Sequence, residues 1–123
     1  MTVVRVLVVD DVPAYLGAMV AVVAETPGFE VVGEASSGED ALVVAAQSLP
    51  DLVLMDVHLP GIDGVEATRR LLLGACPPTV VLLSTYDDDA GQHFVAESGA
   101  TAYVQKAVFG PDRLEHEWSA AQR

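Results

Sequence analysis

The chain has 123 residues, a length that suits one domain with a sizeable hydrophobic core. Its 18 acidic and 6 basic residues give a formal net charge of −12, which disfavours direct binding of this segment to DNA or to an anionic membrane. The longest apolar run, residues 16–24, is too short to cross a bilayer, and we find no secretion signal. The single cysteine, Cys76, cannot form an internal disulfide, so we expect a cytoplasmic protein.

The first half of the chain alternates between β-rich runs and segments with helical spacing. Residues 3–10 are almost wholly apolar, and Pro13 marks the first turn of the helix that follows them. Residues 29–35 form a more mixed run, after which Ser37 and Asp40 resemble a capping box. Residues 51–56 are again apolar, and we expect a third helix from Gly64 to Gly74.

The second half continues the alternation. Residues 79–84 are apolar, and a helix ending at Gly99 follows them. Residues 101–106 form a mixed run, and Gly110 and Pro111 start the last helix. Apolar runs are typical of strands covered on both faces, whereas mixed runs indicate strands nearer an edge. The sequence therefore predicts an α/β fold with a five-stranded, doubly wound parallel sheet and right-handed crossovers.

The first helix is unusual because residues 14–24 carry no charge, and Glu25 is the first charged residue of the helix. A helix that is apolar on most faces is either buried all round or presents a docking face. The sequence leaves both interpretations open.

Five polar residues follow the apolar runs at the points where strands are expected to end: Asp10, Asp11, Asp56, Ser84 and Lys106. Each alone has an ordinary structural explanation as a cap, a turn residue or a solvated lysine. In a parallel sheet, however, all strands deliver their last residues to the same edge, where ligands bind.

Three carboxylates at one edge cannot be balanced by one lysine, so either a pKa rises or a metal binds. Oxygen ligands with room for waters suit Mg²⁺. A metal, a lysine and a hydroxyl can together stabilise the oxygens of a phosphoryl group, which leaves one carboxylate as the nucleophile.

Four segments, "VLVVDD", "DLVLMDVHLPGIDG", "VVLLSTYDDD" and "SGATAYVQKA", resemble the motifs of response-regulator receiver domains in bacterial two-component signalling. The resemblance runs over about residues 3–114. Among receivers, the segments are most similar to those of regulators with a LuxR-type helix-turn-helix DNA-binding domain. The resemblance implies the flavodoxin-like (βα)5 fold for residues 1–123 and an effector domain that lies outside this chain.

By position, the resemblance implies that Asp56 accepts a phosphoryl group from a histidine kinase. Asp10 and Asp11 would hold Mg²⁺ together with Asp56 and the backbone carbonyl of His58. The domain would thus be a phosphoacceptor that assists only its own phosphorylation and dephosphorylation, and not an enzyme acting on other substrates.

The resemblance also implies a switch. Lys106 would pair with the phosphoryl oxygens, Ser84 would close onto them, and Tyr103 would change rotamer. The added charge would bias a surface made by the fourth helix, the fifth strand and the fifth helix. The output partner is a DNA-binding domain or a separate protein, and homodimerisation on phosphorylation is left open.

Several positions depart from the commonest receiver pattern. Ala107 stands where many receivers have proline after the lysine, Ser84 replaces the more frequent threonine, and Thr85 is larger than the usual alanine. His58 and Tyr86 flank the expected site, and our hypothesis is that they set the lifetime of the aspartyl phosphate.

Two alternative functions remain open at this point. A pseudo-receiver would use this fold as an interaction module without phosphorylation, although such modules typically lack one of the acids or the lysine. A hydrolase of the haloacid-dehalogenase type also forms an aspartyl phosphate, but it normally has an acid two residues after the nucleophile, where this chain has His58.

Overall fold

Strands and helices alternate along residues 2–85 and 88–122, the part of the chain that the computed structural model describes. The strands are β1 (Val4–Val9), β2 (Phe29–Ala35), β3 (Leu52–Asp56), β4 (Thr79–Ser84) and β5 (Ala102–Gln105). The α-helices are α1 (Pro13–Glu25), α2 (Gly38–Ser48), α3 (Gly64–Leu72), α4 (Asp88–Ser98) and α5 (Pro111–Ala121), and a short 3-10 helix (Lys106–Val108) follows β5. The predicted element order is therefore confirmed.

The five strands form one parallel sheet in the order β2-β1-β3-β4-β5. This order confirms the doubly wound sheet, and the reversal of strand order lies between β1 and β3. The two mixed runs of the sequence are the edge strands β2 and β5, while the three apolar runs are the central strands, as predicted.

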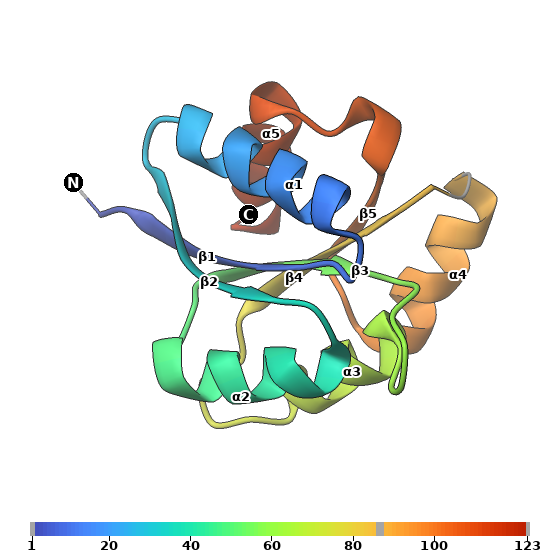
Figure 1. Cartoon of the computed structure of the whole chain (residues 1–123). Helices are drawn as coiled ribbons and strands as arrows, with labels where there is room; N and C mark the ends of the chain where they lie inside the picture. The colour runs from blue at the N-terminus through green and yellow to red at the C-terminus, as the bar shows by residue number, and fades with distance from the viewer. Residues whose placement is uncertain (1, 86–87, 123) are drawn as a thin grey trace.

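Helices cover both faces of the sheet (Figure 1). Helices α1 and α5 lie on one face, and α2, α3 and α4 lie on the other. Successive residues of the central strands alternate between two hydrophobic cores because side chains of a strand point to opposite faces. The core under α2 and α3 receives Leu7, Val9, Val53, Met55, Val80 and Leu82, and the core under α1 and α5 receives Val6, Val8, Leu52, Leu54, Val81 and Leu83.

The apolar helix α1 is buried along one stripe only. Met19 and Val23 pack into the core, whereas its outer face exposes mainly small residues. These outer residues are Ala14, Gly17, Ala18, Ala21 and Ala24. Within the described residues the interpretation of all-round burial is therefore wrong.

The predicted helix ends are largely confirmed. The Ser37 hydroxyl accepts a hydrogen bond from the backbone N–H of Asp40 at 3.0 Å, as the capping-box pattern predicted. Helix α3 begins at Gly64 as expected, but it ends at Leu72, before Gly74. The residue before α1 is Val12, and its side chain makes no capping hydrogen bond. The chain enters α1 instead through a turn in which the backbone N–H of Val12 donates to Asp10 Oδ1.

Candidate functional site

The carboxyl ends of four strands bring the predicted polar residues to one edge of the sheet. Asp10 and Asp11 follow β1, Asp56 and Ser84 are the last residues of β3 and β4, and Lys106 follows β5. Asp10, Asp56 and Ser84 are buried, whereas Asp11 is exposed. The Lys106 side chain is 11% exposed. The sequence prediction of a shared edge is thus confirmed.

Backbone interactions of the loop after β1 hold Asp10. Its N–H donates to the carbonyl of Ala35 at 3.1 Å, which continues the pairing of β1 with β2 by one residue. Its Oδ1 accepts from the N–H of Val12 at 3.0 Å, a local side-chain turn that leads directly into Pro13 and α1. The carboxylate is therefore placed by the same turn that begins the helix.

Asp56 is held by the segment that follows it. The N–H of Val57 donates to the carbonyl of Leu83 at 3.0 Å, and the N–H of Gly64 donates to the carbonyl of Val57 at 2.8 Å. A Cβ at Gly64 would overlap the backbone oxygen of Asp56, so α3 can approach the end of β3 this closely only with glycine at its start.

Lys106 lies between the two buried carboxylates. Its Nζ is 2.8 Å from Asp10 Oδ2 and 3.3 Å from Asp56 Oδ1. Although burial lowers the pKa of Lys106, the hydrogen bond to Asp10 and the charges of both carboxylates raise it above its usual value. The ammonium therefore stays charged and partly neutralises the pair.

One ammonium does not balance the site. Burial, followed by the charge of Asp10, raises the pKa of Asp56 from 3.8 to about 6, against the opposing effects of Lys106 and of the backbone hydrogen bond from His58. Oxygens of Asp10, Asp11 and Asp56 all lie within 4.8 Å of one another. This close set of hard oxygen ligands with excess negative charge fits a Mg²⁺ ion.

Ser84 and Tyr103 lie on neighbouring strands. Ser84 follows Leu83, the residue of β4 in register with Asp56. Tyr103 pairs in register with Leu82, and its ring lies so close to Gly91 of α4 that a Cβ there would overlap it. The structure thus places Ser84 beside the acidic residues and Tyr103 against α4.

His58 connects the acidic site with α4 through aromatic contacts. Its ring lies edge-on to Phe94, with centroids 5.8 Å apart, and Phe94 lies 6.4 Å from the ring of Tyr103. Tyr86, the other residue proposed to set the phosphoryl lifetime, lies outside the described residues.

The sequence did not reveal Tyr15 as part of the site. Its ring covers the Lys106 ammonium, with Nζ 4.1 Å from the ring centroid. Tyr15 stands in the third position of an otherwise apolar helix, and no spacing rule relates it to residue 106. Only the folded chain brings the start of α1 next to the segment that follows β5.

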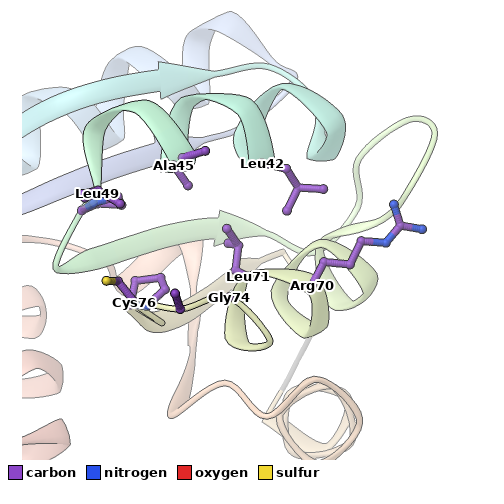
Figure 2. Close-up of a pocket in the computed structure, with 11 residues that line it drawn as sticks. Leu42, Ala45, Leu49, Arg70, Leu71, Gly74 and Cys76 are labelled. Carbon is purple, nitrogen blue, oxygen red and sulfur yellow. The ribbon is translucent and has the colours of Figure 1, made fainter.

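A separate apolar pocket of about 330 Å³ lies away from these residues, between α2 and the loop after α3 (Figure 2). Leu42, Ala45, Leu49, Leu71 and Cys76 are among the residues that line it. Pro50 and Pro78, which precede β3 and β4, also contribute, so this pocket is at the amino ends of the strands and is not the acidic site.

A model of the response regulator receiver domain matches residues 6–118. The chain belongs to this family. Phosphorylation-dependent switching is the general function of receiver domains, and receivers bind Mg²⁺ in an acidic pocket of the kind formed here by Asp10, Asp11 and Asp56.

This receiver domain is similar to the receiver-containing half of named response regulators, one of which is called a transcriptional regulatory protein. The response regulator GacA of Pseudomonas aeruginosa is 39% identical over 85% of this chain and 49% of that protein. The transcriptional regulatory protein LiaR of Bacillus subtilis is 35% identical over 84% of this chain and 49% of that protein. The receiver chain thus spans about half the length of these curated relatives.

Solved structures agree with the receiver assignment. A LuxR-family two-component response regulator from Aurantimonas sp. superposes with a TM-score of 0.86 at 29% identity, covering 98% of this chain and 85% of that chain. The signal receiver domain of NarL from Mycobacterium tuberculosis superposes with a TM-score of 0.88 at 28% identity, covering 99% of this chain and 98% of that chain. The resemblance to receivers of the LuxR type is confirmed.

One relative carries an enzyme name. A Myxococcus xanthus protein named protein-glutamate methylesterase/protein-glutamine glutaminase 4 is 38% identical over 88% of this receiver but over only 31% of its own length. The similarity therefore covers a minor part of that protein, and most relatives are signalling response regulators. No helix among the described residues of the receiver is long and apolar enough to span a membrane.

Proposed function

We propose that this receiver domain is the phosphoacceptor switch of a two-component regulator and that Asp56 accepts the phosphoryl group from a histidine kinase. One observation carries the proposal. Asp56 is a buried carboxylate at a strand end, with a lysine ammonium 3.3 Å from its Oδ1 and two further carboxylates within 4.8 Å. Such a set supplies a nucleophile, a fixed cation and a metal site at one place.

In the proposed reaction an Oδ of ionised Asp56 attacks the phosphorus of a phosphohistidine. A P–O bond forms, the N–P bond breaks, and its electron pair stays on the departing imidazole nitrogen. The reaction requires the ionised carboxylate, and a pKa of about 6 keeps most of Asp56 ionised at neutral pH. Lys106 is already positioned to hold its ammonium against the incoming phosphoryl oxygens.

Asp10, Asp11, Asp56 and the backbone carbonyl of His58 are the residues that would hold Mg²⁺. The bound ion would neutralise charge on the phosphoryl oxygens during transfer. Asp10 is fully buried and turned into the site by its bond to Val12, so it is available as a ligand without rearrangement of the loop.

We propose that the regulator is cytoplasmic and that its output is the control of transcription. LiaR is named a transcriptional regulatory protein and GacA a response regulator, and the chain spans about half of the length of each. A DNA-binding domain outside this segment is therefore the proposed effector. Movement of Ser84 and Tyr103 in response to the added charge would change the surface of α4, β5 and α5. Tyr103 packs against Gly91 of α4 and lies 6.4 Å from the ring of Phe94. A homodimer formed on phosphorylation is one form that this output can take.

The test is incubation with Mg²⁺ and acetyl phosphate, followed by intact-mass measurement. We expect one added phosphoryl group on the wild-type chain and none with EDTA or in the Asp56→Ala variant. Asp112→Asn, which changes an exposed carboxylate in the first turn of α5, is the matched control and should be phosphorylated normally. An adduct that persists in Asp56→Ala, or no adduct at all, would contradict the proposal, and the second result would favour a pseudo-receiver.

A further inference from the structure

The ammonium of Lys106 has three described contacts, and these come from three elements. Asp10 lies after β1 and Asp56 at the end of β3, while the third contact is the ring of Tyr15 in α1 at 4.1 Å. An ammonium within about 6 Å of an aromatic centroid is attracted by the negative face of the ring. Tyr15 therefore binds the charge of Lys106 as well as covering its side chain.

Two of these three contacts belong to the acidic cluster. Asp10 and Asp56 are the carboxylates that would share their oxygens with a divalent cation. A cation bound there would compete with Lys106 for both carboxylates and would repel its ammonium. An aromatic ring face is no ligand for Mg²⁺, which takes oxygen ligands, so the contact with Tyr15 is not shared.

Lys106 also has room to leave the site. A cavity of about 240 Å³ beside it is lined by Tyr15, Thr85, Gln105, Lys106 and Ala107. A long lysine side chain without a fixed partner gains rotamer freedom by moving into such a space. The ring of Tyr15 forms one wall of this cavity and limits that movement.

The position of Tyr15 is set together with that of the acids. The bond from Val12 N–H to Asp10 Oδ1 turns the chain into α1, and Tyr15 is the third residue of that helix. Tyr15 is 42% exposed, and its ring lies over Lys106 without being part of a core cluster. The turn that orients Asp10 therefore also places the ring over the lysine.

We propose that Tyr15 is a positioning residue, whose ring keeps the Lys106 ammonium at the phosphoryl site when Mg²⁺ occupies the carboxylates. The proposal rests on the function proposed above, because the position of Lys106 matters for phosphoryl transfer to Asp56. The ring acts through Lys106 and need not touch the phosphoryl group.

The sequence offers a clean probe, since Lys106 is the only lysine of the chain. Isotope-labelled lysine therefore gives a single set of side-chain NMR signals. The variants are Tyr15→Phe, which keeps a ring, and Tyr15→Leu, which keeps apolar bulk without one. The spectra are recorded without metal and with saturating Mg²⁺.

In the wild type and in Tyr15→Phe we expect the Lys106 signals to keep a ring-current shift in both conditions. In Tyr15→Leu that shift is lost, and with Mg²⁺ the signals should move to the values of a mobile lysine. The rate of phosphorylation by acetyl phosphate should fall about five-fold in Tyr15→Leu and stay within about two-fold of wild type in Tyr15→Phe. Mg²⁺ affinity should be unchanged in both.

Equal behaviour of Tyr15→Leu and wild type in the Lys106 spectra would overturn the proposal, and so would an equal loss of rate in the Phe and Leu variants. The spectra do not depend on phosphorylation. If the wild type formed no aspartyl phosphate, the proposed function would fail, while the effect of Tyr15 on Lys106 would still be measured.

Discussion

Removing the charge of Asp56 should change how the stability of the domain depends on pH. Burial and the charge of Asp10 raise the pKa of Asp56 from 3.8 to about 6. The native state then binds the proton more tightly than the unfolded state does. Stability from this group is therefore greatest at low pH, falls as pH rises from about 3.8 to about 6, and levels off above that.

The magnitude follows from the shift. The rise in the pKa of Asp56 from 3.8 to about 6 corresponds to about 3 kcal/mol of lost stability at pH 8 and to about half of that at pH 5. The Asp56→Asn variant has nearly the same shape and does not titrate. In metal-free buffer it should be more stable than the wild type, and its advantage should grow by about 1 kcal/mol between pH 5 and pH 8.

Urea denaturation in EDTA measures this difference, with the fluorescence of Trp118 as the signal. Trp118 is the only tryptophan, and its ring lies edge-on to Phe29 with centroids 6.5 Å apart, far from the substituted residue along the chain. Asp112→Asn is again the control, because it removes one exposed carboxylate outside the site. A constant difference between wild type and Asp56→Asn across this pH range would refute the reasoning.

Two glycines provide further predictions. Gly64→Ala places a methyl group against the backbone of Asp56 and Val57. We expect it to lower the unfolding free energy by about 2 kcal/mol and to slow phosphorylation. Gly110→Ala is the control, because a methyl group there meets nothing within 4 Å and should cost little stability. Equal stability of these two variants in urea would argue against the close approach. Gly91→Ala would ordinarily stabilise a helix by about 1 kcal/mol, but here the methyl overlaps the Tyr103 ring. Gly91→Ala should therefore lower the unfolding free energy of the wild type and raise that of a Tyr103→Ala variant. A higher unfolding free energy in both would contradict the contact between Gly91 and Tyr103.

Much of the site was predictable because it depends on topology alone. Once residues 51–56 and 79–84 are identified as central parallel strands, Asp56 and Ser84 must lie at the same edge, and the same argument applies to Asp10 and Lys106. The start of α3 at Gly64 was predictable too, although the sequence did not show that this glycine touches the backbone of Asp56.

Other features depended on how the helices pack. The hydropathy of α1 did not predict which of its faces is buried, because apolar residues occur on all of them. Similarly, the contact between His58 and Phe94 joins a loop to a helix about 36 positions further along the chain, and no periodic pattern encodes such a distance.

Sequence patterns are enough to predict the order of the elements, the central and edge strands, and the set of acids and lysine that share one edge. Strand periodicity is a local pattern, and right-handed parallel crossovers then bring the carboxyl ends of all strands to one edge. The three-dimensional packing adds two features that no sequence pattern predicted: Lys106 lies between Asp10 and Asp56, and the ring of Tyr15 covers it. These contacts depend on the reach of the side chains and on how the start of α1 lies against the residues after β5, and burial at this edge is the largest cause of the raised pKa of Asp56.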